Sequence, residues 1–313
     1  MNGVVIIDKP AGKTSHDIVS QVKKILGAKK AGHTGTLDPM ATGVLPVCLN
    51  EATKLAGFLA DEGKEYLATM LLGVKTDTMD TEGKIISRSD QKVSADEIRA
   101  AMTRMVGKIQ QVPPAYSAVK YCGEPLYKWA RKGIVVESAP REVEIQHIAI
   151  EDISFPRVIF RVACSKGTYI RALCADVGEM LGCGACLCEL RRLRSGLFSE
   201  DMAVSLDNPL VADKKVALTA KLLPMSKLLP CMKTVEVKDT FAERLRDGFQ
   251  PSVEAMKSYV LPFLEAGDMI KFTNCNGSLV ALAEMIASVG SFPEMDEKSQ
   301  AARIVRVFNN IRN

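Results

Sequence analysis

Apolar side chains recur at helical spacing in three parts of the chain, and each set is followed by a glycine. The first set follows Thr14 and Ser15, which can cap a helix, and comprises Ile18, Val19, Val22, Ile25 and Leu26. The second follows the capping-box pair Ser94 and Glu97 and comprises Ile98, Met102, Met105 and Val106. The third comprises Ile170, Leu173, Val177 and Leu181. We expect an amphipathic helix at each place, with Arg171 just off the apolar face of the third.

Strand patterns lie between and beyond these helices. Residues 65–72, "EYLATMLL", read as a buried strand, and residues 158–164, "VIFRVAC", alternate as a strand does. A proline-punctuated stretch at residues 221–238 precedes three short strand-like pieces at 268–274, 278–286 and 303–309. The chain of 313 residues is longer than one small core usually fills. We therefore predict two domains, residues 1–230 and a small β-rich domain of residues 231–313.

One carboxylate stands in an unusual setting, the stretch "GHTGTLDPMATGVLPV" from Gly32 to Val47. Asp38 precedes Pro39, and an Asp-Pro pair is a good helix start because the side chain can accept from free backbone N–H groups. The same glycine-rich loop could instead let a nucleic-acid backbone approach while it presents Asp38 for chemistry. A phosphate-binding P-loop is excluded, since no Gly-Lys-Ser/Thr follows at the required spacing. The local pattern leaves capping and chemistry both open.

Composition narrows the class of protein. No apolar run approaches the roughly 18 residues of a membrane helix, and the N-terminal apolar patch is too short for a signal peptide, so we predict a cytoplasmic protein without a membrane partner. The nine cysteines are expected to be reduced thiols, and their one cluster, Cys183, Cys186 and Cys188, lacks a visible fourth ligand. With three histidines in the chain, we expect no metal site.

The net charge of +4 matters less than its distribution. Four lysines crowd the approach to the glycine-rich loop, Lys23, Lys24, Lys29 and Lys30, and "LRRLR" brings together Arg191, Arg192 and Arg194. Residues 111–133 mix tyrosines, the single tryptophan and several cations. Such clusters suit a polyanion whose bases stack on aromatic rings, although solvated helix faces and a covered core edge would look the same.

An ordered set of blocks resembles the TruB-type tRNA pseudouridine synthases, which modify uridine 55 in the T-loop of tRNA. The blocks are "DKPAGKTSHDIV", "GHTGTLDPMATGVLPV", "KEYLATMLLG", "PPAYSAVK" with "LYKWARKG", "SKGTYIRAL" and "LRRLRSG". The tail, with "RLRDGFQP" and "SLVALAE", more loosely resembles a PUA-type RNA-binding domain. The resemblance implies an α+β fold: a catalytic core with a mixed, mainly antiparallel sheet flanked by helices, followed by a small β-rich PUA-like domain.

The resemblance also implies roles for particular residues. It makes Asp38 the catalytic aspartate, Arg171 its partner cation and Tyr66 the aromatic ring against the flipped uracil. Further residues implied to line or support the site, or to contact the RNA, are Lys9, Pro10, His33, Gly35, Asp80, Tyr169 and Leu190. Cys186 departs from the pattern, because relatives often carry His there.

Pseudouridine formation moves a base from an N–C to a C–C bond with no net gain of electrons or atoms, so no cofactor is expected. A carboxylate must either attack C1′ or remove the 2′ proton, and a nearby cation favours its ionised form. The expected partner is the T-stem-loop of tRNA, bound by a monomer. Two alternatives stay open: a tRNA-binding or tRNA-folding protein without catalysis, and a synthase that acts on another RNA.

Overall fold

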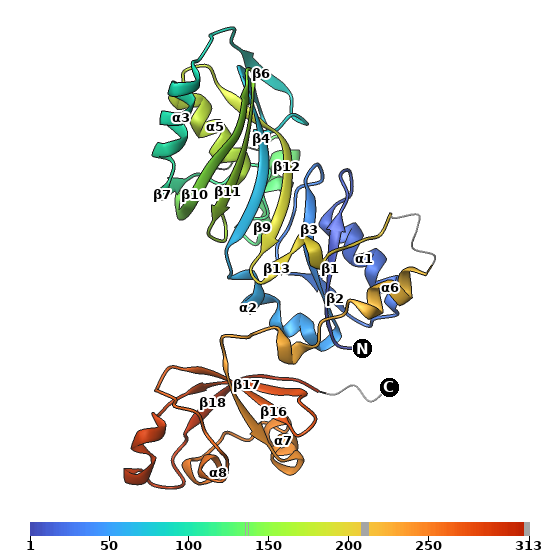
Figure 1. The fold of residues 1–313 in the computed structure, drawn as a ribbon, viewed down its shortest axis with the longest axis vertical. Helices are drawn as coiled ribbons and strands as arrows, with labels where there is room; N and C mark the ends of the chain where they lie inside the picture. The colour runs from blue at the N-terminus through green and yellow to red at the C-terminus, as the bar shows by residue number, and fades with distance from the viewer. Residues whose placement is uncertain (135, 137, 208–212, 310–313) are drawn as a thin grey trace.

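The computed structural model describes residues 1–134, 136, 138–207 and 213–309, and its main feature is one long mixed sheet (Figure 1). Within the described residues its strands run in the order β14 (Val204–Ser205), β1 (Gly3–Lys9), β3 (Thr42–Leu49), β12 (Ala185–Ser195), β4 (Lys64–Leu72), β11 (Arg157–Cys164), β10 (Arg141–Ser154) and β7 (Gly107–Gln111). Two short strands join the sheet at its side: β2 (Ala31–His33) on β3 and β13 (Phe198–Ser199) on β12. The β1/β14 and β3/β12 pairs are parallel and the others antiparallel. The expected mixed, mainly antiparallel sheet is confirmed.

Three helices pack on one face of this sheet, α1 (Ser15–Leu26), α3 (Ala95–Arg104) and α5 (Ile170–Met180), and all three contribute to one apolar core. The capping box predicted at Ser94 and Glu97 forms at the start of α3, and Thr14, one of the two expected capping residues, forms another at the start of α1. The second helix ends earlier than expected: Val106 lies beyond α3 and is exposed. Shorter helices are α2 (Ala56–Ala60), α4 (Leu126–Arg131) and α6 (Lys214–Ala220).

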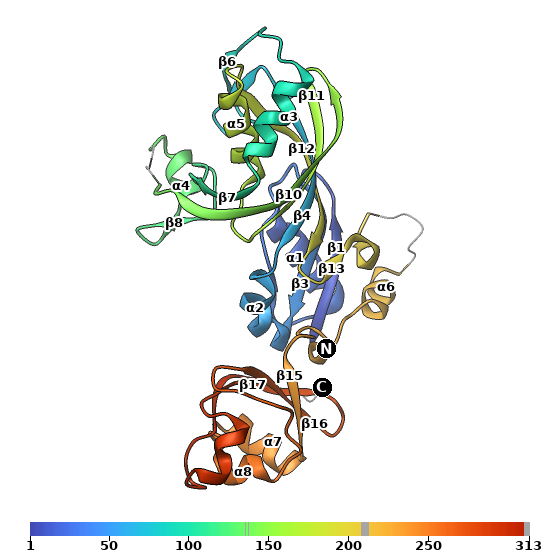
Figure 2. The ribbon, with the colours of Figure 1, turned by 60° about the vertical axis from the view of Figure 1, so that its left-hand side comes forward.

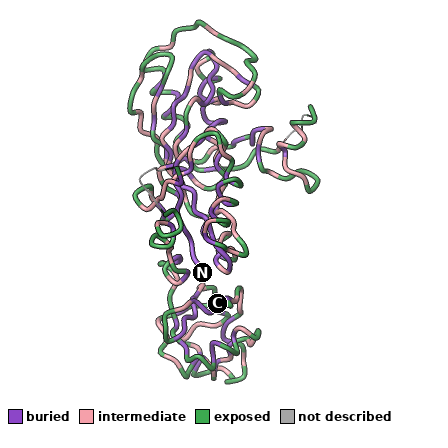
Figure 3. The backbone as a smooth tube through the Cα atoms, turned by 90° about the vertical axis from the view of Figure 1, so that its right-hand side faces the viewer, coloured by how far each residue is buried: buried purple, intermediate pink, exposed green. Residues whose placement is uncertain are grey.

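Two small hairpins extend from the main sheet. One pairs β5 (Val74–Thr76) with β6 (Ile85–Arg88), and the loop between them carries Asp80. The other pairs β8 (Lys120–Tyr121) with β9 (Glu124–Pro125) and continues into α4. Residues 117–134, here called the arm, protrude from the side of the molecule (Figures 2 and 3). The exposed cations of the arm therefore stand away from the core: Lys120, Lys128, Arg131 and Lys132.

The C-terminal part forms its own sheet, in the order β15 (Lys233–Val237), β16 (Met269–Asn274), β17 (Leu279–Met285) and β18 (Ala302–Val307). Helices α7 (Asp239–Arg246) and α8 (Val253–Lys257) cover it, and a second core gathers around Phe241 and Phe272. All three strand-like pieces of the sequence form strands here. The proline-punctuated stretch is more than a linker, because it supplies β15.

A third apolar cluster, here called the seam, joins the two parts of the molecule. Alternate residues of β1 face opposite ways: Val5 and Ile7 join the core under α1, whereas Val4 and Ile6 face the seam. The C-terminal part contributes Leu279, Leu282 and Phe308 to the seam. Since both faces of β1 are buried, its side chains form a continuous apolar run, as they do in covered strands generally.

Polar contacts border the seam. Lys54 Nζ donates to the Val307 carbonyl at 2.9 Å, and the Asn309 N–H donates to the Glu51 carboxylate at 2.8 Å. The C-terminal sheet therefore docks through both apolar and polar contacts, and we propose residues 230 and 231 as the boundary between two domains that share this seam. No helix among the described residues is long and apolar enough to cross a membrane.

The seam predicts a large cost for removing the Phe308 ring. Phe308 is fully buried, so Phe308→Ala leaves a cavity and lowers the free energy of unfolding by roughly 3–5 kcal/mol. Phe263→Ala, in the same sheet domain but with a ring that is 75% exposed, changes it little. Urea titrations followed by circular dichroism measure both variants, and equal stabilities would show that the seam does not form in solution.

Candidate active site

The loop that carries Asp38 is held on both sides by hydrogen bonds. The Ser15 hydroxyl, in the first turn of α1, donates to the Leu37 carbonyl at 3.1 Å and accepts from the Leu37 N–H at 2.8 Å. A turn follows, in which the Ala41 N–H donates to the Asp38 carbonyl, and β3 begins at Thr42. No helix starts after Asp38 in this described stretch, so the capping interpretation is wrong. Pro39 opens a turn into a strand, and the Asp38 side chain is left for another partner.

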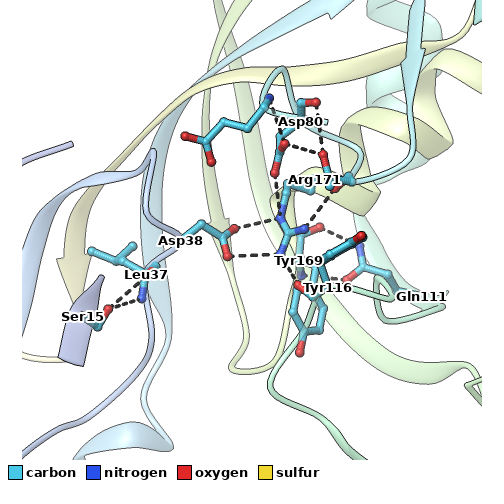
Figure 4. Close-up of polar contacts among 10 residues, drawn as sticks. Ser15, Leu37, Asp38, Asp80, Gln111, Tyr116, Tyr169 and Arg171 are labelled. Atoms are coloured by element: carbon cyan, nitrogen blue, oxygen red, sulfur yellow. Dashed lines mark hydrogen bonds and ion pairs between the residues drawn. The ribbon is translucent and has the colours of Figure 1, made fainter. Parts of the chain in front are cut away.

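That partner is Arg171, the second residue of α5 (Figure 4). Its Nε donates to one Asp38 oxygen at 2.8 Å and its Nη2 to the other at 3.1 Å. The arginine side chain is only 4% exposed, whereas that of Asp38 is 32% exposed. A bidentate pair fixes the plane of a carboxylate, and here one side of that carboxylate still faces outward. The predicted pairing of these two residues, 133 positions apart, is present in the structure.

Three further groups surround the same guanidinium. Arg171 donates to the carbonyls of Thr78 at 3.0 Å and Tyr116 at 2.9 Å, and the Asp80 carboxylate lies 3.7 Å from its Nε. Asp80 is buried and also accepts from the Thr78 hydroxyl at 2.5 Å. Figure 4 shows the Asp80 carboxylate directed toward the guanidinium, at the same Nε that donates to Asp38. Asp80 can orient the arginine from this position.

Lys9 closes the other side of the Asp38 turn. The side chain is fully buried, and its Nζ donates to the carbonyls of Pro10 at 2.9 Å, Pro39 at 3.0 Å and Ala41 at 2.6 Å. Burial lowers the pKa of the Lys9 ammonium to about 8, and the nearby Asp38 carboxylate partly opposes this shift. The three carbonyl bonds compensate a buried charge that contacts no carboxylate of the described residues. Lys9 and Pro10 therefore fix the backbone that positions Asp38.

Arg192 organises the glycine-rich part of the loop, a specific role that the sequence pattern did not predict. It is 1% exposed, and it donates from Nε to the Val44 carbonyl at 2.7 Å and from Nη2 to the Gly35 carbonyl at 3.1 Å. His33, on β2, has a buried Nδ1 without a partner among the described residues, and burial lowers the pKa of its imidazole. Gly43 has a φ of 98°, and a Cβ there would lie 2.2 Å from the Arg192 carbonyl oxygen. Close packing of β3 on β12 therefore requires this glycine.

Tyr66 and Leu190 lie in the core on adjacent strands, each 8% exposed. In the β4/β12 register Tyr66 stands opposite Arg192 and Leu190 opposite Ala68. Burial raises the pKa of the Tyr66 hydroxyl, while the Arg192 charge acts in the opposite direction. The ring is therefore a neutral phenol at physiological pH. Tyr169, which precedes α5, is half-buried.

The "LRRLR" segment presents less free cationic surface than the sequence suggested. It lies in β12, where Arg191 pairs with Asp8 at 2.9 Å and Arg194 with Glu65 at 3.4 Å, while Arg192 is buried. Arg192 is therefore not accessible to a polyanion, whereas Arg191 and Arg194 are ion-paired side chains that are 34% and 44% exposed. The other cluster behaves differently: its four lysines are exposed at and beyond the end of α1, Lys23, Lys24, Lys29 and Lys30.

The cysteine cluster is split by the fold. Cys183 and Cys186 are buried and Cys188 is half-buried, all as free thiols. Burial raises the pKa of the Cys186 thiol to about 11, which keeps it protonated. Among the described residues no group of three or more His, Cys, Asp or Glu side chains is arranged to hold a metal ion.

Gln111, Thr78 and Tyr116 support the site, but sequence reasoning missed them. Thr78 and Tyr116 act through their carbonyl oxygens, which any residue could supply. Gln111, at the end of β7, is 2% exposed and binds the backbone of Tyr169 twice. In the sequence, Gln111 is marked only by its position at the end of a strand that is followed by two prolines.

Comparison with solved structures defines the class. The fold is similar over 98% of the chain to one titled "Crystal Structure of a Cbf5-Nop10-Gar1 Complex", with a TM-score of 0.73, 32% identity and 85% of that chain covered. It is also similar, over 99% of the chain and 86% of the other, to one titled "Structure of H/ACA RNP bound to a substrate RNA containing 2'-deoxyuridine", with a TM-score of 0.72 and 29% identity. The fold is that of a pseudouridine synthase.

Sequence relatives specify the family. A family model described as "TruB family pseudouridylate synthase (N terminal domain)" matches residues 23–170, and "tRNA pseudouridylate synthase B C-terminal domain" matches residues 171–230. A protein named tRNA pseudouridine synthase B from Syntrophus aciditrophicus is 50% identical over 99% of both chains. One of the same name from Geobacter sulfurreducens is 41% identical over 99% of this chain and all of the other. The chain belongs to the TruB family of pseudouridylate synthases, so the resemblance seen in its sequence is confirmed.

The geometry of the pair predicts that Arg171 cannot be replaced by another cation. Lysine has no planar fork, so Arg171→Lys frees the Asp38 carboxylate and lowers the single-turnover rate of uridine isomerisation by roughly 100-fold. Arg161→Lys is the matched control, because Arg161 also binds a carboxylate, that of Glu151, but on the exposed side of β11. Rapid-quench assays measure both variants. A parent-like rate for Arg171→Lys would show that the bidentate geometry is not needed.

Proposed function

We propose that this protein isomerises a uridine in tRNA to pseudouridine, and that the target is uridine 55 in the T-loop. The observation that carries the proposal is the Asp38 carboxylate, which is partly exposed and held in plane by the buried Arg171. Membership of the TruB family supports the reaction, and relatives named tRNA pseudouridine synthase B support the substrate. The T-loop position rests on the sequence resemblance.

The reaction needs one carboxylate at the sugar and no external reagent. The N1–C1′ bond breaks, the uracil turns, C5 bonds to C1′, and a proton leaves C5 while N1 takes one up. Asp38 either attacks C1′ or removes the 2′ proton to form a glycal. Each Asp38 oxygen accepts one hydrogen bond from Arg171, so each keeps a lone pair for the substrate.

The remaining residues have proposed roles around that carboxylate. Tyr66 holds the detached uracil by its ring and, as a neutral phenol, can relay the C5 proton only by passing its own hydroxyl proton on to a water molecule; otherwise water takes the C5 proton directly. Tyr169 and Leu190 line the base pocket, and His33 fills the space that displaced bases leave. Lys9, Pro10 and Gly35 support the loop. Asp80 acts through Arg171, which revises the direct substrate contact implied by the resemblance.

A surface for RNA is proposed beside the site. Lys29 and Lys30 lie between α1 and β2, on the chain that leads into the Asp38 loop, and both are exposed. The arm adds rings and cations, with Lys132 over the Trp129 ring and Arg131 over the Tyr127 ring. The C-terminal β domain adds further contacts with tRNA. We propose a monomer acting in the cytoplasm.

The alternatives differ in what they require of Asp38 and of the substrate. A binding protein without catalysis does not require a carboxylate that is held in one plane and is partly exposed. A synthase for another RNA keeps the same chemistry, and the proteins in the similar solved structures assemble with others. Conversion of a purified T-stem-loop by the protein alone supports the proposal, and conversion of other RNAs alone contradicts its substrate.

Asp38→Asn separates catalysis from binding. Asparagine keeps the shape and loses the negative charge, so isomerisation of a T-stem-loop should fall below detection while the affinity for tRNA is kept or increased. Asp61→Asn, which replaces an exposed carboxylate paired with Lys166, is the control and should behave as the parent does. Chemical mapping of pseudouridine and filter binding give the two readouts. A folded Asp38→Asn protein that converts uridine at the parental rate would falsify the mechanism.

The lysines before the Asp38 loop predict a salt dependence. If Lys29 and Lys30 contact phosphates, their replacement by Gln should weaken tRNA binding and reduce the log–log salt slope by about one unit for each contact. Replacing Lys84 and Lys92, which are exposed near the β5/β6 hairpin, should leave the slope unchanged. Filter binding over a salt series measures the slope, and equal slopes for the two double variants would exclude this surface.

A further inference from the structure

Gln111 makes two hydrogen bonds to the backbone of Tyr169 (Figure 4). The Tyr169 N–H donates to Oε1 at 2.8 Å, and Nε2 donates to the Tyr169 carbonyl at 3.1 Å. Tyr169 is the N-cap residue directly before α5, and its side chain makes no capping bond there. The side chain of a distant residue thus holds the start of the helix that carries Arg171.

The chain after Gln111 returns to the same helix. Residues 112–116 lead from β7 toward the arm, and the carbonyl of Tyr116 accepts from Arg171 at 2.9 Å. This short segment is therefore tied to α5 at both ends, through Tyr169 and through Arg171. Because the arm begins directly after Tyr116, this segment connects the start of the arm, here called its root, to the ion pair of Arg171 and Asp38.

We propose that Gln111 is a positioning residue that couples the root of the arm to the Arg171–Asp38 pair. The inference deepens the proposed function and rests on it. RNA bound to the arm exerts a force on residues 112–116. The hydrogen bonds of Gln111 prevent this force from moving Arg171 away from Asp38. A displacement of about 1 Å at a reacting group can cost roughly 100-fold in rate, so two buried hydrogen bonds are enough to matter.

The burial of Gln111 supports a positioning role over a role at the surface. Gln111 is 2% exposed, and its neighbour Gln110 on the same strand is exposed. A buried amide is expensive unless both its donor and its acceptor are used, and here both are used on one residue. The pair Gln110 and Gln111 therefore offers a matched comparison within a single strand.

The test replaces the amide with groups of similar size. Gln111→Met removes both bonds, and we expect the single-turnover rate on a T-stem-loop to fall about tenfold or more, with tRNA affinity within about threefold of the parent. Gln110→Met should retain the parental rate. The melting temperature of each protein separates an effect on the rate from a loss of folded protein.

Gln111→Glu gives a readout that a simple loss of stability would not move. A carboxylate can accept from the Tyr169 N–H, but it can donate to the Tyr169 carbonyl only when protonated. The rate of this variant, relative to the parent at the same pH, should therefore rise as the pH is lowered, and this series decides the question if Gln111→Met does not fold.

Other results overturn the inference. A parental rate for folded Gln111→Met, a loss of rate explained by weaker binding, or a Gln111→Glu rate ratio that does not change with pH would each show that Gln111 does not position the site. If the parent protein itself fails to convert uridine, the proposed function fails instead. The two failures are therefore distinct.

Discussion

A buried guanidinium with fixed acceptors on several sides is the interaction on which the site depends. Arg171 donates hydrogen bonds to Asp38, Thr78 and Tyr116, which come from three loops far apart in the sequence. A charge removed from water is tolerated only while such partners stay in place. The loops that supply them are consequently held to one another through a single side chain, and the position of the carboxylate follows from that arrangement.

Much of this arrangement was accessible from the sequence because it depends on local patterns. Capping boxes and helical spacing located α1 and α3, and the helix expected after residue 169 is α5. The ordered blocks identified Asp38 and Arg171 as a pair, although no spacing rule joins residues so far apart. The three C-terminal strands were visible from their short apolar runs between turn residues.

The errors have physical causes. In β12 the register shifts between Leu187 and Glu189 and again between Arg192 and Arg194, so the strand loses the strict alternation that would have revealed it. Its arginines then resembled a solvated cluster, and the buried Arg192 went unrecognised. Asp38 before Pro39 matched a helix start because a turn into a strand uses the same residues. Backbone carbonyl acceptors could not be predicted, because a residue of any type can supply them.

The seam has a consequence for how the chain is made. Residues 1–230 leave the ribosome first, and until the last strands follow, the apolar residues of the seam lack their contacts with Leu279, Leu282 and Phe308. At about 5–20 residues per second the remaining chain takes on the order of ten seconds to synthesise. During that interval the part of the seam that the C-terminal domain later covers is exposed, an apolar surface of the kind that chaperones bind. Exchange of that domain between relatives would therefore have to preserve Leu279, Leu282 and Phe308.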